Sequence, residues 1–257
     1  MHPMLNIAIR AARAAGDLIA RSFESDVDIK PERKGDNDYV TKIDKEAEQL
    51  IINKIKQSYP EHSFVGEELG ITDGSDDFKW IIDPLDGTNN FVMGIPHFAV
   101  SIALMYKGKL DQAVVFDPIR HELFTASKGN GAQMNNYRLR VNTQKDLEGT
   151  FLATGFPYKN KEGANEAIQR FSQVYQRSGD VRTSGSSALD LAYVAAGRLD
   201  GYWEKGIKPW DVAAGELLVK EAGGLVTDYQ GGHEHFRSGE IVAGHPKVVQ
   251  NIVKLIK

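Results

Sequence analysis

The spacing of hydrophobic residues divides the chain into three stretches of different character. In the first, apolar residues recur at helical spacing and predict helices over residues 4–23 and 44–58, with Asp44 at the N-cap of the second. The polar, turn-rich segment 25–40 between them is compatible with a pair of strands or with an ordered loop.

In the middle stretch, from residue 63 onward, the pattern changes to short hydrophobic segments separated by turns such as Lys107-Gly108-Lys109. Segments this short and closely spaced are typical of an antiparallel meander. The predicted strands cover residues 63–65, 80–83, 99–106, 112–117, 122–126 and 132–134.

The last stretch alternates strands with helices, without an internal repeat or a low-complexity linker. Strands are predicted at residues 150–154, 201–203, 225–228 and 241–243, and helices at 164–177, 187–196, 211–221 and 247–256. We therefore expect a mixed α/β (α+β) fold in layers. It should form a single domain over residues 1–257, with a soft boundary near 140–150 where polar residues cluster.

Composition narrows the class of protein. The 257 residues are 41% hydrophobic and 26% charged, which is ordinary for a soluble enzyme, and the net charge of −4 favours no nucleic-acid ligand. The lack of cysteine excludes disulfides, thiolate metal sites and a cysteine nucleophile, and it suits a cytoplasmic protein. No segment approaches the roughly 18 uninterrupted apolar residues of a membrane span.

Three acidic clusters carry the candidate chemistry. Glu67-Glu68 follows a predicted strand, Asp83 and Asp86 flank a Pro-Leu pair at the end of another, and Asp211 opens a helix. The two isoleucines before Asp83 require burial and the proline bends the chain, so Asp83 and Asp86 should meet at the mouth of the core. Carboxylates placed there repel each other unless a cation lies between them. Oxygen ligands without a softer donor nearby favour Mg²⁺.

Each cluster also has a simpler interpretation on its own. The Asp-Pro-Leu-Asp-Gly string is typical of a turn, the glutamate pair of a solvated surface, and Asp211 of a helix N-cap. Residues 185–187 open a predicted helix and are compatible with a plain cap, and His97 beside a proline is expected to be structural. The three acidic clusters together are far more specific than any one of them.

The joint pattern resembles the inositol monophosphatase family. WIIDPLDGTNNF is similar to that family's metal-binding signature and WDVAAGELLVKEAGG to its second signature, while GEE and GSSALDLAYVAAGRLDGYWE agree in order and spacing. The resemblance covers nearly the whole chain, and its start, MHPMLNIAIRAAR, most resembles the bacterial extragenic-suppressor (SuhB-type) branch. It implies a layered α-β-α-β-α sandwich of the inositol monophosphatase/fructose-bisphosphatase type, assembled as a homodimer.

The resemblance also implies a role for particular residues. The implied ligands of two to three Mg²⁺ ions are Glu67, Asp83, the Leu85 carbonyl, Asp86 and Asp211. The implied substrate contacts are Asp86, Gly87, Thr88, Gly185, Ser186, Ser187 and Glu204. The residues that would orient the attacking water are Glu67, Thr88 and Asp44, and Lys34 would lie on a loop over the site. Asn89 and Asn90 depart mildly from the pattern, because a second threonine is common after Thr88.

The implied reaction is in-line attack of a metal-activated water on a small phosphate monoester, with inositol 1-phosphate favoured and with sensitivity to lithium. A 3′-phosphonucleotide, fructose bisphosphate, NADP or histidinol phosphate remains open as the substrate. The alternative is a binding module. Proteins of the SuhB-type branch are also associated with antitermination of ribosomal RNA transcription, through transcription factors and RNA polymerase.

Overall fold

The computed structural model describes residues 2–25, 32–35, 38–40, 42–156 and 161–257. Its helices are α1 (Pro3–Glu24), α2 (Lys42–Lys56), α3 (Thr88–Val92), α4 (Ala164–Tyr175), α5 (Ser187–Ala195), α6 (Pro209–Glu221), α7 (His235–Ser238) and α8 (Pro246–Ile256). None of these helices combines the length and the apolar character that a membrane crossing requires.

The larger sheet has the strand order β10-β9-β8-β7-β6-β5-β3-β4. Its strands are β3 (His62–Gly66), β4 (Gly70–Thr72), β5 (Ser75–Asp86), β6 (Ala99–Tyr106), β7 (Lys109–Asp117), β8 (Glu122–Ser127), β9 (Gly131–Met134) and β10 (Tyr137–Arg138). The predicted antiparallel meander is confirmed from β5 to β9, and β10, which was not predicted, continues it. It is wrong for β3, which pairs with β5 in parallel because β4 turns back along the other edge of β3.

The smaller sheet has the order β12-β11-β13-β15-β14, with parallel and antiparallel pairs. Its strands are β11 (Phe151–Thr154), β12 (Asp180–Arg182), β13 (Gly201–Lys205), β14 (Leu225–Thr227) and β15 (Glu240–Gly244). Residues 25–40 were compatible with a pair of strands or with a loop. They contain the antiparallel pair β1 (Glu32–Gly35) and β2 (Asp38–Val40).

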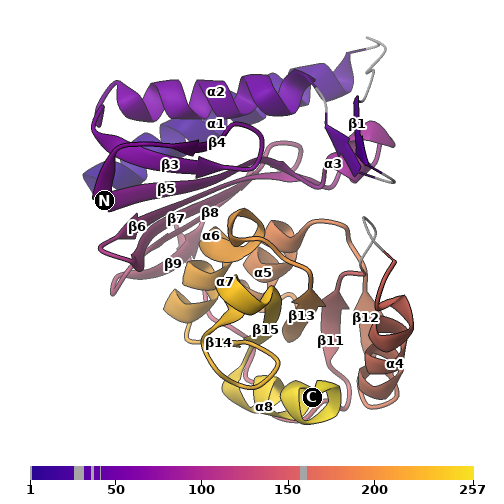
Figure 1. Cartoon of the computed structure of the whole chain (residues 1–257). Coiled ribbons are helices and arrows are strands. Elements are labelled where there is room, and N and C mark those ends of the chain that lie inside the picture. Colours follow the sequence, from indigo (N-terminus) through magenta and orange to yellow (C-terminus); the bar gives the residue numbers. More distant parts are fainter. Residues whose placement is uncertain (1, 26–31, 36–37, 41, 157–160) are drawn as a thin grey trace.

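These elements stack in five layers, as the resemblance implied. Figure 1 shows α1 and α2 above the larger sheet, α5 and α6 between the sheets, and α4 and α8 below the smaller sheet. Both faces of β5 are therefore covered. Trp80 and Ile82 belong to the core under α1 and α2, and Ile81 between them belongs to the core around α5 and α6. This position explains the continuous hydrophobic run that leads to Asp83, since side chains alternate across a strand.

The predicted helix starts need two corrections. Helix α2 begins at Lys42, so Asp44 lies in its first turn instead of at the N-cap, where a carboxylate still interacts favourably with the helix dipole. Helix α6 begins at Pro209 with Lys208 at the N-cap, because proline suits the first helical position; Asp211 is its third residue. Ser186 is the N-cap of α5, with its side chain accepting from the Leu189 N–H.

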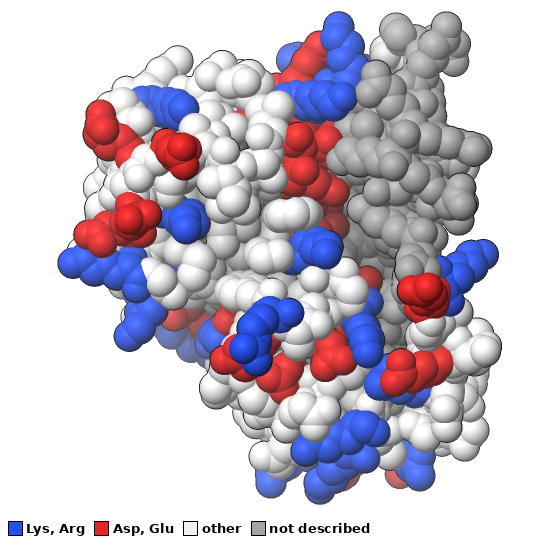
Figure 2. All heavy atoms as spheres, viewed as in Figure 1, with Lys and Arg blue, Asp and Glu red and all other residues white. Residues whose placement is uncertain are grey.

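Charges of both signs are interspersed over the face of the molecule drawn in Figure 2. This distribution fits the small net charge of −4. A continuous basic stripe of the kind that follows a nucleic-acid backbone does not cross the described part of that face.

Candidate active site

A bulge in β5 brings two aspartates to the same side of the larger sheet. Asp83 pairs with Ser101 of β6 and Asp86 with Ala99, so β5 has one residue more than its partner between these two pairs. Residues three apart in a regular strand face opposite sides, but the extra residue turns Asp86 to the side of Asp83. Both side chains are nearly inaccessible, at 1% and 8% exposure.

Asp86 is held by the N-terminus of α5. Its Oδ2 accepts hydrogen bonds from the Ser186 hydroxyl and, at 2.8 Å, from the Ala188 N–H. Burial raises the pKa of Asp86 to about 7 against the opposing effect of these two donors, with a further contribution from the charges of Glu67 and Glu204. Ser186, implied as a substrate contact, is thus already engaged as a cap and as a partner of Asp86.

Asp83 lies at the centre of the acidic residues. Its Oδ1 accepts from the Leu85 N–H at 3.0 Å. Burial, followed by the negative charges of Glu67, Asp86 and Asp211, raises the pKa of Asp83 well above its usual range. The fold therefore brings together the three acidic clusters, whose residues Glu67, Asp83, Asp86 and Asp211 follow one another at separations of 16, 3 and 125 residues along the chain.

The donor set suits a hard divalent cation. Its side chains are carboxylates, and their mutual repulsion in a buried setting is what a bound cation would relieve. Within the described ranges, no three His, Asp or Glu side chains already have the close arrangement of a metal site.

Glu67 is positioned by a residue that the sequence analysis missed. Glu48 of α2 is fully buried, and its carboxylate accepts from the N–H groups of Glu68 at 2.8 Å and Leu69 at 3.0 Å. A Cβ at Gly66 would lie 1.9 Å from Glu48 Oε1, so this position requires glycine. The available signal was a charged residue on the apolar face of an amphipathic helix.

Thr88 and Asp44 meet as the resemblance implied. Thr88 Oγ1 lies 3.1 Å from Asp44 Oδ1 and 3.0 Å from the Leu85 carbonyl oxygen. Asp44 is buried at 1% exposure behind the threonine. Gly87, at the start of α3, has a φ of 98°, in the left-handed region that glycine occupies without strain.

Asp211 contributes to its own helix start as well as to the acidic cluster. Its Oδ2 accepts from the Lys208 N–H at 2.6 Å, so the interpretation as a helix-capping residue holds in part, from the third position instead of the N-cap. Its charge also raises the pKa values of Asp83 and of Glu204.

The smaller sheet contributes Glu204 to the site. Burial raises the pKa of Glu204 to about 7, while the Tyr202 hydroxyl donates to its carboxylate. Asp190 of α5, which the sequence analysis also missed, has a pKa raised well above its usual range by burial, with the charges of Glu204 and Asp86 nearby. A lone aspartate in the apolar run of α5 was its signal. The side chain of Lys34 lies outside the described residues.

The layered fold is that of a family of phosphatases, and the comparison with known proteins agrees. The chain belongs to the inositol monophosphatase family, whose model matches residues 1–257. Nus factor SuhB of Escherichia coli (strain K12) is 57% identical over 251 residues, which cover 97% of this chain and 94% of that protein.

Solved structures of relatives share the whole fold. The extragenic suppressor protein suhB from Bartonella henselae is 41% identical, with a TM-score of 0.96 over 100% of this chain and 99% of its own. The inositol monophosphatase from Anabaena (Nostoc) sp. PCC 7120 is 38% identical, with a TM-score of 0.88 over 98% of this chain and 94% of its own.

We expect the metal-free protein to lose stability as the pH rises from about 4 to about 7. In this window folded Asp86, with its pKa of about 7, keeps a proton that an unfolded aspartate has released. The folded state then binds more protons than the unfolded state, so rising pH favours unfolding. Asp86→Asn should reduce the loss by an amount on the order of 4 kcal/mol, because each unit of pKa difference is worth about 1.4 kcal/mol. Urea unfolding in EDTA across this window measures it.

The control is Asp77→Asn, which changes an exposed aspartate and should leave the pH dependence unaltered. An Asp86→Asn variant whose stability falls with pH as steeply as that of the wild type would show that Asp86 is ionised throughout the window in the folded state.

Proposed function

We propose that the protein hydrolyses small phosphate monoesters with Mg²⁺ as the cofactor. The observation that carries this proposal is the burial of Asp83 and Asp86 at the bulged end of β5 beside the charges of Glu67 and Asp211. Burying several carboxylates together destabilises the fold, and a cation bound between them would offset this cost. Membership of the inositol monophosphatase family supports the same reaction class.

The residues fall into two overlapping sets of ligands. Glu67, Asp83 and the Leu85 carbonyl would hold one Mg²⁺, and Asp83, Asp86 and Asp211 a second, with Glu67 able to reach a third. Bound Mg²⁺ supplies a water of lowered pKa and neutralises charge on the leaving oxygen. Asp83 is common to both sets, which agrees with its central place among the charges.

The chain's own residues would orient the attacking water. Asp44 is buried and accepts a hydrogen bond from the Thr88 hydroxyl. The lone pairs of Thr88 Oγ1 can then accept a hydrogen bond from water. The Glu67 carboxylate would accept the other proton of this water. The backbone N–H groups of Gly87 and Thr88 would donate to the phosphate oxygens.

Inositol 1-phosphate is the substrate that we favour. Asp86, Glu204 and the loop of residues 185–187 would accept or donate hydrogen bonds to the hydroxyl groups of a polyol. The similarity to an inositol monophosphatase over 98% of this chain supports this choice. A 3′-phosphonucleotide, fructose bisphosphate, NADP or histidinol phosphate would use the same phosphate chemistry with different hydroxyl contacts.

The direct test is release of inorganic phosphate from a panel of these monoesters, with and without Mg²⁺. We expect turnover that requires Mg²⁺, is abolished by excess EDTA and returns when Mg²⁺ is restored. Without a cation, the negative carboxylates would repel the negative phosphate. Li⁺ should inhibit it, as the family resemblance implies. Full turnover in EDTA after exhaustive dialysis would disprove the metal mechanism.

Glu67→Gln should lower kcat by several orders of magnitude, because it removes a negative charge that both holds the cation and accepts from the water. Glu68→Gln is the matched control. It makes the same chemical change one residue away, on a side chain assigned no ligand role, and should keep most of the activity. Thermal melting shows whether both variants fold. A Glu67→Gln variant with more than about a tenth of the wild-type kcat, a loss of only ~1.4 kcal/mol, would refute this role.

A second function rests on the 57% identity to Nus factor SuhB of Escherichia coli. We propose that the chain also binds the transcription machinery, as a homodimer or a monomer, independently of catalysis. The test is a pull-down of purified RNA polymerase and transcription factors with the wild type and with Glu67→Gln. We expect equal binding by both, because the substitution removes one charge at the acidic site and leaves the rest of the surface unchanged. Binding lost in step with phosphatase activity would contradict an independent role.

A further inference from the structure

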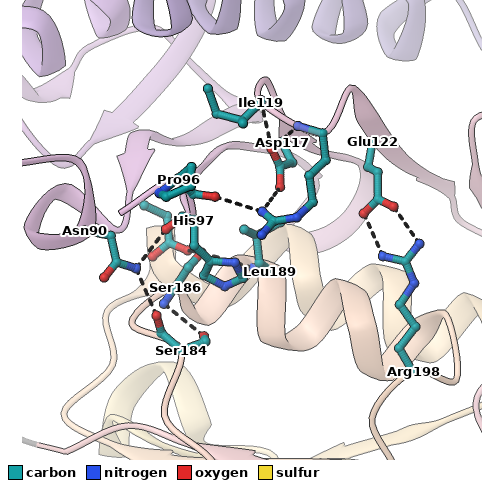
Figure 3. Close-up of polar contacts among 12 residues, drawn as sticks. Asn90, Pro96, His97, Asp117, Ile119, Glu122, Ser184, Ser186, Leu189 and Arg198 are labelled. Carbon is teal, nitrogen blue, oxygen red and sulfur yellow. Dashed lines mark hydrogen bonds and ion pairs between the residues drawn. The ribbon is translucent and has the colours of Figure 1, made fainter. Parts of the chain in front are cut away.

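Asn90 joins two segments that are far apart in the sequence. It lies in α3, two residues after Thr88, and its Nδ2 donates to the His97 carbonyl at 2.8 Å and to the Ser184 carbonyl at 2.9 Å (Figure 3). An amide nitrogen carries two hydrogens, so both of its donors are used. One side chain thus links the end of the metal-binding signature to the loop before α5.

The first of these carbonyls packs against the turn assigned to the phosphate. A Cβ at Gly87 would lie 3.0 Å from the His97 oxygen, so the two backbones are in close approach. The segment of His97 is also anchored from the other side. Arg120 Nη1 donates to the Pro96 carbonyl at 3.0 Å and pairs at 2.9 Å with Asp117, whose side chain is fully buried (Figure 3).

The second carbonyl precedes the loop assigned to the polyol. Gly185 has a φ of 84°, and a Cβ there would lie 3.0 Å from Asn90 Nδ2. The same residue is also tied to α5, because Ser184 Oγ donates to Asp190 at 2.8 Å and accepts from the Ser186 N–H at 3.3 Å. Two strand-end segments of the larger sheet therefore hold the loop: Asn90 binds the Ser184 carbonyl, and Asp86 of β5 binds the Ser186 hydroxyl.

We propose that Asn90 is a positioning residue that sets the separation between the phosphate-binding turn, Gly87–Thr88, and the polyol-binding loop, residues 184–187. Each carbonyl that it holds lies beside a glycine of the site, so loss of the amide breaks this link between the two halves and leaves the loop held to β5 by the hydrogen bonds of Asp86 with Ser186 and Ala188. The inference rests on the proposed phosphatase function and adds the residue that aligns its two halves.

Loss of Asn90 should impair the binding of substrates that contact both halves of the site. An inositol phosphate must reach the turn with its phosphate and the loop with its hydroxyls. 4-Nitrophenyl phosphate has no hydroxyls and needs only the phosphate half. A residue that served stability alone would affect both esters alike.

The experiment compares the KM and kcat of both esters for Asn90→Ala and the wild type at saturating Mg²⁺. The first ester is inositol 1-phosphate, or the hydroxyl-bearing monoester of the panel that the wild type turns over fastest. We expect its KM to rise about tenfold, while KM and kcat for 4-nitrophenyl phosphate stay within about twofold. Inhibition by inorganic phosphate, which occupies only the phosphate half, should not change.

Two further variants serve as controls. Asn90→Asp keeps the size of the side chain but replaces the donor by an acceptor that faces two carbonyls, so it should raise the same KM at least as much and answers the question if Asn90→Ala does not fold. Asn251→Ala removes a surface amide of α8 that donates to the Lys145 carbonyl at 3.2 Å, and should leave both esters unaffected.

The outcomes separate this inference from the function on which it rests. Equal losses on both esters, or an unchanged KM for the hydroxyl-bearing ester in Asn90→Ala and Asn90→Asp, would overturn the positioning role while the phosphatase assignment stands. A wild-type protein that releases phosphate from neither ester would overturn both.

Discussion

The extra residue that β5 inserts after Asp83 is the constraint on which the rest of the site depends. It directs both aspartates of this strand end toward α5 and α6, into a buried region where their charges and those of Glu67 and Asp211 repel one another. The surrounding structure offsets part of this cost through hydrogen bonds from the N-terminus of α5 to Asp86. A bound cation would relieve the repulsion that these hydrogen bonds leave.

Helix α2 shows how one element serves the core and the site together. Its apolar residues cover the outer face of the larger sheet, but two of its acidic residues are buried with them. Asp44 meets Thr88 after β5, and Glu48 binds the backbone after β3. The ends of two neighbouring strands are thus held by the same helix, which keeps Glu67 and the aspartates of β5 in register.

The candidate site draws its residues from both sheets and from the helices between them. The larger sheet supplies the candidate metal ligands of β3 and β5, whereas the smaller sheet supplies Glu204 and α5 supplies the loop at Gly185. Helix α6 packs between the sheets and contributes Asp211. Under the proposed function, a change in the smaller half would alter which monoester is accepted without altering the carboxylates of β3 and β5.

The sequence by itself determined the order of the main helices and strands, because periodicity over long segments such as residues 4–23 reports directly on burial. It also identified the three acidic clusters, because each lies within a contiguous sequence motif that the family resemblance recognises. Only the tertiary structure decided that β3 runs parallel to β5, that Asp44 and Asp211 lie inside their helices, and that Glu48, Asn90 and Asp190 support the site. Those roles depend on partners 6 to 94 residues away, and local periodicity carries no information about contacts made by a single polar side chain across the fold.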